Sequence, residues 1–211
     1  MKKKITIFDY DAGNNLSVYR AFKACGADVE ITDNLKKIKD SSYLVLPGDG
    51  AFGYAASQFR RLEVIPLIQN HIKKGKPLLG ICLGMQILCS KSEEFGMHQG
   101  LSIIKGKTVK IKSNIKKFIK VPVIGWHQLQ INEINKNNLF KKLNKYNKKK
   151  FYFLHSFMVK PVNKKELLGY YNFGKEKITA IIGKDNVLGF QFHPEKSGLE
   201  GIKLLKNFLK F

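Results

Sequence analysis

The first 81 residues alternate between short strand-like runs and longer stretches of helical periodicity, which restricts the possible folds more than any other feature. The strand-like runs occupy residues 5–8, 29–31, 43–46 and 77–81. Apolar side chains recur at helical spacing in residues 16–25 and 64–74, and another helical run begins near Ala51. Strands that alternate with helices pair in parallel, so this part predicts an α/β fold with a mostly parallel, twisted sheet and helices on both faces.

Short strand-like segments separated by turns replace this alternation after about residue 100. They occupy residues 106–111, 121–124, 126–131, 151–155, 167–171, 178–182 and 187–192. Their close spacing favours antiparallel or mixed pairing and predicts a smaller antiparallel sheet portion. Residues 136–150 are polar and basic, with a short helix expected at residues 138–143, and are interpreted as an exposed connection. We expect one domain over residues 1–211.

The formal net charge of +22 is large, but the residues that carry it argue against a dedicated nucleic-acid-binding surface. Lysine supplies nearly all of the excess, whereas arginine, the better reader of bases and phosphates, occurs only at Arg20, Arg60 and Arg61. We therefore interpret lysine as a solubilising surface residue. A basic nucleic-acid-binding protein stays the non-enzyme alternative, and its affinity would fall steeply with salt.

The composition also predicts a cytoplasmic protein without a membrane span. No apolar run approaches the roughly 18 residues that a span requires, and Asp9 and Asp11 interrupt the N-terminal stretch that resembles a signal peptide. Cys25, Cys82 and Cys89 show neither a disulfide framework nor metal-binding spacing. We expect no metal, no cofactor and at least one free thiol.

One cysteine lies between two glycines where the fourth strand meets the next helical run. The sequence at residues 80–84 is Gly-Ile-Cys-Leu-Gly, and an amphipathic run begins at Met85. A sharp strand-to-helix turn lifts the intervening side chain above the sheet edge, which is the geometry of a nucleophile elbow. The helix N-terminus would favour a reactive thiolate. Cys82 is therefore a candidate nucleophile, and a buried structural cysteine is the alternative.

A cysteine nucleophile requires a base, and the base requires a group that orients it. His193 and Glu195 project to the same side if the chain is extended through Pro194. The alternatives are a core histidine and an exposed charge near a helix start. Ser197 and Glu200 have capping-box spacing and predict where the C-terminal helix begins.

These residues resemble a known family. Gly-Ile-Cys-Leu-Gly-Met-Gln at residues 80–86 and His-Pro-Glu at residues 193–195 resemble the Cys-His-Glu signature of class I (triad) glutamine amidotransferases. Supporting matches lie at residues 9–14, 47–50, 92–94, 125–126, 152–156 and 192–197. Within the class, the chain is similar to the glutaminase subunits of imidazole glycerol phosphate synthase. The resemblance implies the fold of this class and hydrolysis of glutamine to glutamate and ammonia.

The resemblance also implies a role for each matching residue. Cys82 would form a γ-glutamyl thioester, His193 would transfer protons and Glu195 would orient His193. Backbone amides would hold the oxyanion, and these belong to Leu83 and to the strand with Gly48, Asp49 and Gly50. The amino-acid end of glutamine would contact Gln86, Glu94, His155, Ser156 and Phe157, where a structural role is the alternative for His155.

A partner follows from the same resemblance. The ammonia would pass into a (β/α)₈-barrel cyclase subunit that makes imidazole glycerol phosphate in histidine biosynthesis, and the two chains would form a heterodimer because this chain is too short to contain both units. Asp11, Asn14 and Trp126 belong to motifs expected at the subunit interface. A core aromatic is the alternative for Trp126.

The chain departs from the family pattern at two places. Asp49 stands where the family has a small apolar residue, and Ile124 and His127 flank Gly-Trp where the family has Met and Asn. Both changes suggest a paralogous glutaminase that feeds ammonia to a synthase for an acetamidino sugar of a surface glycan. A cysteine hydrolase of the related peptidase or deglycase type is a further alternative, although that type lacks the His-Pro-Glu ending.

Overall fold

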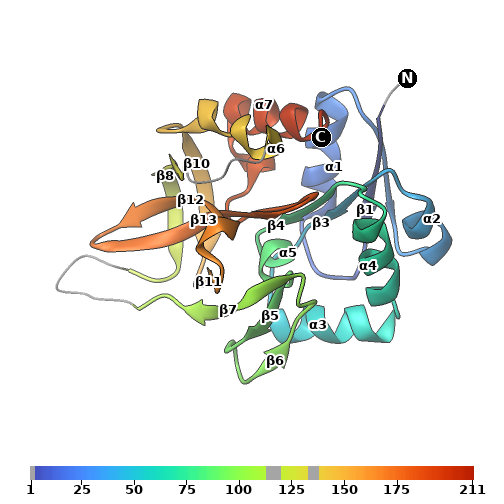
Figure 1. Ribbon diagram of the computed structural model, residues 1–211, viewed down its shortest axis with the longest axis horizontal. Coiled ribbons are helices and arrows are strands. Elements are labelled where there is room, and N and C mark those ends of the chain that lie inside the picture. The colour runs from blue at the N-terminus through green and yellow to red at the C-terminus, as the bar shows by residue number, and fades with distance from the viewer. Residues whose placement is uncertain (1–2, 113–119, 133–137) are drawn as a thin grey trace.

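The centre of the molecule is a mixed sheet of eight strands, seen edge-on in Figure 1. The computed structural model describes residues 3–112, 120–132 and 138–211. The strand order is β2-β1-β3-β4-β14-β13-β12-β9. In that order the strands are Asp28–Thr32, Lys4–Phe8, Tyr43–Leu46, Leu78–Ile81, Val187–Phe190, Glu176–Lys184, Leu167–Phe173 and Gln130–Ile131.

The first five strands of this order run parallel, and the other three pair antiparallel. Strands β3, β4 and β14 are buried at every position, because layers of side chains cover both faces of the sheet. Leu79 of β4 is level with Val45 of β3 and Leu188 of β14. The predicted α/β fold is confirmed, and its carboxyl edge brings the ends of β4 and β14 side by side.

Helices cover both faces of the parallel half. α1 (Asn15–Ala24) and α7 (Gly198–Phe208) pack on one face, where Phe22 and Phe208 join the same apolar cluster (Figure 1). α2 (Leu35–Asp40), α3 (Phe52–Arg61) and α4 (Ile65–Lys73) cover the other. The sequence reading missed α2, whose signal is the Asn34 side chain that accepts hydrogen bonds from two backbone amides of the first turn.

The described residues also form two smaller sheets. β8 (Val123–Gln128) and β10 (Lys150–His155) form an antiparallel pair. A four-stranded sheet contains β11 (Phe157–Pro161), β7 (Ile104–Lys110), β5 (Cys89–Ser92) and β6 (His98–Gln99). The expected antiparallel portion is therefore present, but β5, β6 and β11 were not predicted.

The basic connection before β10 is less exposed than the sequence suggests. Its described part contains α6 (Asn138–Lys141) and the 3₁₀ turn η2 (Asn144–Tyr146), whereas residues 136 and 137 lie outside the described residues. Phe140, Leu143 and Tyr146 are buried against the main apolar cluster. The interpretation as an exposed connection holds for the other described positions, most of which are exposed, and is wrong for these three apolar side chains, which anchor the segment.

Candidate active site

Cys82 follows β4 in the middle of the sheet and occupies a strained turn. Its φ of 53° lies in the left-handed region that non-glycine residues rarely adopt. A methyl group on Gly80 would lie 2.4 Å from the carbonyl oxygen of Gly84, and one on Gly84 would lie 1.7 Å from that of Leu46. The two glycines therefore let the backbone segments approach closely enough to hold the cysteine in this conformation.

The helix after Cys82, α5 (Leu83–Gln86), has only four residues. All four are buried, so the prediction of an amphipathic run from Met85 is wrong. The physical reason is that α5 packs against both β4 and β14 and has no face toward solvent. The backbone amides of Met85 and Gln86 donate hydrogen bonds to the Cys82 carbonyl at 3.0 and 3.1 Å, which holds the turn.

His193 and Glu195 follow β14 and reach the same edge of the sheet as Cys82. His193 Nδ1 lies 2.8 Å from Glu195 Oε1, and both side chains are almost fully buried. The chain forms the 3₁₀ turn η4 (Pro194–Lys196), so the expected extended path through Pro194 is wrong. The amide of Lys196 donates to the His193 carbonyl at 3.1 Å, and this turn, not strand alternation, brings the two side chains together.

Ser197 stabilises that turn instead of forming the predicted capping box. Its hydroxyl donates to the His193 carbonyl at 2.6 Å and accepts a hydrogen bond from the Tyr152 amide at 3.0 Å. Glu200 pairs with Lys203 at 2.7 Å. Ser197 thus anchors the backbone of His193. The sequence had predicted that its hydroxyl caps the C-terminal helix, and no such hydrogen bond is present at Ser197.

Charge and burial act in opposite directions on His193. Burial lowers its pKa, but Cys82 and Glu195 favour the protonated ring and raise the pKa above its ordinary value. Its Nε2 is buried and has no conventional hydrogen-bond partner among the described residues, but it is within electrostatic range of Cys82. Asn14, which was predicted at the subunit interface, donates from Nδ2 to Glu195 Oε1 at 2.7 Å and therefore lies against this carboxylate.

Two further groups surround the Cys82 sulfur. The thiol is 3.8 Å from the carbonyl oxygen of Leu154, which can only accept, and Gln191 Nε2 is 3.7 Å from the sulfur and can donate to it. Gln191 is completely buried. Sequence reasoning missed Gln191, and the available signal was an amide in an otherwise apolar strand, two residues before His193.

Residues 47–50, which were predicted to supply oxyanion amides from a strand, form a loop after β3 and lie over α5. The amide of Leu83 donates to the Gly48 carbonyl at 3.3 Å, and the Tyr10 hydroxyl donates to the Pro47 carbonyl. Asp49 and Gly50 are exposed at the site. In this arrangement the Leu83 amide is already engaged by Gly48, so an oxyanion could accept its hydrogen bond only after this loop has turned.

A cavity of about 250 Å³ adjoins the sulfur. It is lined by Asp49, Gly50, Cys82, Leu83, Gln86, Glu94, Pro122, residues 154–157, His193 and Lys196. The structure thus brings together every residue predicted to hold the amino-acid end of glutamine. Glu94 Oε2 accepts a hydrogen bond from the Phe52 amide at 2.7 Å, and Gln86 Nε2 donates to the Phe157 carbonyl at 3.3 Å, so both side chains are fixed.

His155 is held as a neutral ring. Its Nδ1 donates to the Phe157 carbonyl at 2.7 Å, which leaves Nε2 to accept from the Tyr171 hydroxyl at 2.9 Å. Burial lowers the pKa of His155 to about 4. Both ring nitrogens are occupied, which favours the structural alternative for His155 over direct contact with a substrate.

An exposed apolar patch borders the cavity. It consists of Pro122, Ile124, Trp126 and Leu154, and the last three come from the paired strands β8 and β10. Trp126 is 52% exposed and packs edge-on against Tyr152, so it is not a core aromatic. Pro122 and Leu154 also line the cavity, which joins the patch to the nucleophile.

Asp11 lies on another loop at the same sheet edge. Its Oδ2 accepts a hydrogen bond from the exposed Tyr54 hydroxyl at 2.6 Å, and its φ is 62°. Gly13, two residues later, packs so closely on the Gly48–Asp49 peptide that a methyl group would lie 2.7 Å from the Asp49 amide nitrogen. This loop therefore contacts both residues 47–50 over α5 and, through Asn14, Glu195.

Within the described residues there is no group of histidine, cysteine or carboxylate side chains that could hold a metal ion. The cysteines Cys25, Cys82 and Cys89 are free. No helix in the described part of the chain is long and apolar enough to cross a membrane.

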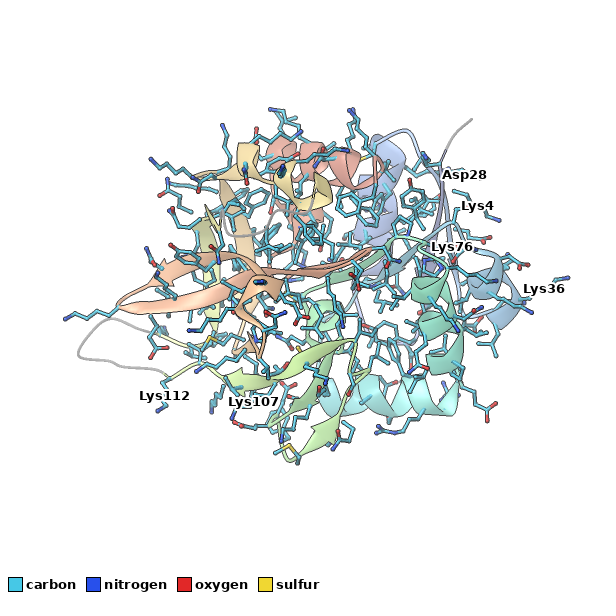
Figure 2. All side chains as sticks on the ribbon, in the orientation of Figure 1. Lys4, Asp28, Lys36, Lys76, Lys107 and Lys112 are labelled. Atoms are coloured by element: carbon cyan, nitrogen blue, oxygen red, sulfur yellow. The ribbon has the colours of Figure 1, made fainter. Side chains whose placement is uncertain are left out.

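Lysines are spread over the molecule. Figure 2 shows Lys36 and Lys76 on one side of the molecule and Lys107 and Lys112 on another. Such a distribution suits a generally solvated surface better than a single groove for nucleic acid.

A strained cysteine with a buried His–Glu pair at the carboxyl edge of an α/β sheet is the arrangement found in triad hydrolases. The family model described as "Glutamine amidotransferase class-I" matches residues 6–211, and the chain belongs to this family. The resemblance read from the sequence motifs is thereby confirmed.

Close relatives carry a more specific name. The protein from Lactococcus lactis is 42% identical over 99% of this chain and 98% of its own length, and that from Caldanaerobacter subterraneus is 45% identical over 97% and 96%. The Aquifex aeolicus protein is 39% identical over 97% of this chain and 95% of its own length. All three are named imidazole glycerol phosphate synthase subunit HisH.

Solved structures share the fold at lower identity. The PurLQS structure from Thermotoga maritima has a TM-score of 0.73 at 21% identity and covers 100% of this chain and 99% of that one. The glutaminase domain of Trypanosoma brucei CTPS has a TM-score of 0.67 at 15% identity and covers 99% and 94%. The predicted fold class is confirmed.

Proposed function

We propose that this chain is the glutaminase subunit of an imidazole glycerol phosphate synthase in the cytoplasm, folded as one domain over residues 1–211. The observation that carries the proposal is the His193–Glu195 pair at 2.8 Å beside Cys82 on its strained turn. The names of relatives at 39–45% identity support imidazole glycerol phosphate synthase as the enzyme that uses the ammonia. They favour this function over a glutaminase for an acetamidino-sugar synthase and over a nucleic-acid-binding protein.

The first half of the reaction forms a thioester. The Cys82 sulfur attacks the carboxamide carbon of glutamine, and the carbon–nitrogen bond breaks as ammonia leaves with a proton from His193. Glu195 accepts a hydrogen bond from His193 Nδ1, which fixes the ring so that Nε2 faces the reacting atoms. The raised pKa of His193 keeps the proton available for the leaving nitrogen.

The second half releases glutamate. A water molecule gives a proton to His193 and its oxygen attacks the thioester carbon, so the carbon–sulfur bond breaks and Cys82 is restored as thiolate. Both halves pass through a tetrahedral oxyanion. The Leu83 amide and an amide of residues 47–50 stabilise it, and one such donor typically contributes about 10²–10³ in rate.

The Gly48 carbonyl makes this activity depend on a conformational change. The Gly48 carbonyl accepts a hydrogen bond from the Leu83 amide at 3.3 Å, so this amide cannot hold an oxyanion until residues 47–50 turn away. A partner that contacts the loop with Asp11 and Asn14 would act on these residues through Gly13. We therefore expect the cyclase subunit to raise glutamine hydrolysis.

The apolar patch of Pro122, Ile124, Trp126 and Leu154 is the proposed docking surface for that subunit. Docking there would cover the mouth of the cavity, because Pro122 and Leu154 line it. Covering the mouth would direct ammonia into the barrel of the cyclase and away from solvent, where it would be protonated.

Ammonia release from glutamine, measured with and without the cyclase subunit, tests the proposal. His193→Ala should abolish release while the complex still forms on size-exclusion chromatography, whereas the matched His98→Ala on β6 should keep both. Equal turnover of wild type and His193→Ala would refute the triad. Equal turnover with and without the cyclase would refute the coupling.

A further inference from the structure

Gln191 connects the nucleophile to the substrate cavity through side-chain amides. It follows β14 directly, its side chain has no exposed surface, and its backbone amide donates to the Ala180 carbonyl at 2.9 Å. A buried amide is costly unless it is hydrogen-bonded, whereas leucine or methionine would fill the same space without that cost. The partners of Gln191 are therefore informative about why the position is polar.

The hydrogen bonds fix the orientation of the amide group. The Phe157 carbonyl can only accept, so Gln86 must present Nε2 to it at 3.3 Å. The same Nε2 donates to Gln191 at 3.2 Å, which requires Gln191 to present Oε1. Nε2 of Gln191 is consequently directed to the Cys82 sulfur, at 3.7 Å.

The sulfur thus has an acceptor on one side and a donor on the other. As a thiol, Cys82 can donate to the Leu154 carbonyl at 3.8 Å. As a thiolate it has no proton to donate, and that carbonyl repels it, whereas Gln191 Nε2 donates to it. Only the contact with Gln191 becomes stronger when the sulfur acquires its charge, because hydrogen bonds to ionised groups are stronger than neutral ones.

We propose that Gln191 stabilises the Cys82 thiolate and that its orientation is set by Gln86 in the substrate cavity. The inference extends the proposed glutaminase function by a residue outside the Cys–His–Glu triad. Gln86 lines the cavity and Gln191 contacts the sulfur, so the two amides connect substrate binding to nucleophile activation. Loss of Gln191 should lower kcat and leave KM nearly unchanged. Loss of Gln86 should raise KM and also lower kcat, because Gln191 then loses the group that orients its amide.

Alkylation of Cys82 by iodoacetamide tests the inference without relying on glutaminase activity. The rate is measured at peptide level by mass spectrometry, with Cys25 and Cys89 as internal references. Gln191→Met and Gln191→Leu have different shapes, so the test does not depend on one of them folding well; thermal melting checks both. Gln58→Met, which replaces another buried glutamine on α3, is the matched control.

At pH 7 we expect both Gln191 variants to be alkylated about tenfold more slowly at Cys82, the effect of a hydrogen bond worth about 1.4 kcal/mol. Gln58→Met should match wild type. The rates of the Gln191 variants should approach the wild-type rate as the pH is raised, because alkali forms the thiolate without the amide. An unchanged rate at pH 7, or a loss that persists at high pH, would overturn the inference.

The glutaminase assay of the same variants separates this inference from the proposed function. If wild type hydrolyses glutamine and the Gln191 variants have a lower kcat, the proposed glutaminase function and the proposed role of Gln191 are both supported. If wild type does not hydrolyse glutamine but alkylation still depends on Gln191, the proposed function fails and the thiolate contact stands.

Discussion

Gly84→Ala tests the packing that holds the nucleophile on its turn. Gly84 lies in α5, where alanine would ordinarily stabilise a helix by up to about 1 kcal/mol. The added methyl carbon, however, would lie 1.7 Å from the Leu46 carbonyl oxygen and 2.7 Å from its carbon. Contacts below 3.0 Å do not occur, and the obstacle is the backbone of β3, which cannot rotate away. Overpacking of this kind costs about 3 kcal/mol or more.

The measurement is the free energy of unfolding by urea, compared with that of Gly26→Ala. Gly26 has a φ of +83° but open space around its Cβ, so alanine there carries only a left-handed strain of about 1–2 kcal/mol. Gly84→Ala should therefore be the more destabilised variant although its φ is not positive. If it unfolds at the same or a higher urea concentration than Gly26→Ala, close packing at the elbow is not the reason for the glycine.

Three further changes test other parts of the account. Burial lowers the pKa of His155 to about 4, so at this residue the unfolded chain binds more protons below pH 6.5. His155 should therefore reduce the free energy of unfolding by about 2 kcal/mol between pH 7 and pH 5, and in urea denaturation His155→Gln should lose less stability over that range than wild type. Asp49→Val should raise ammonia release by the chain alone several-fold, because a carboxylate at the cavity repels a developing oxyanion, and an unchanged rate would contradict this. Trp126→Ala should weaken the complex with the cyclase in calorimetric titration, whereas Leu199→Ala, which removes a still more exposed apolar side chain on α7, should not.

The sequence predicted the parallel half of the fold because its pattern is local. Strands β3 and β4 are buried on both faces and therefore read as continuous apolar runs, and the glycines at positions 80 and 84 mark the elbow. β5 and β6 escaped prediction because they are short and rich in polar residues, and their pairing with β7 depends on distant residues.

The site residues were found where a motif is contiguous and missed where a role depends on tertiary contacts. His193 and Glu195 stand two apart, but their meeting depends on the η4 turn and on Ser197, which receives the Tyr152 amide from another strand. Gln191 has no motif of its own, and only the fold places it between Gln86 and the sulfur. The engagement of Leu83 by Gly48 is likewise a property of the folded chain.

The most direct test of the central claim compares ammonia release from glutamine by wild type, Cys82→Ala and Cys25→Ala, each with the cyclase subunit. Cys25 is a half-buried thiol near α7, where it contacts the Ile202 carbonyl, and it serves as the matched control. We predict that Cys25→Ala releases ammonia at the wild-type rate and that Cys82→Ala releases none, although it still binds the cyclase. Ammonia release by Cys82→Ala at the wild-type rate would contradict this prediction.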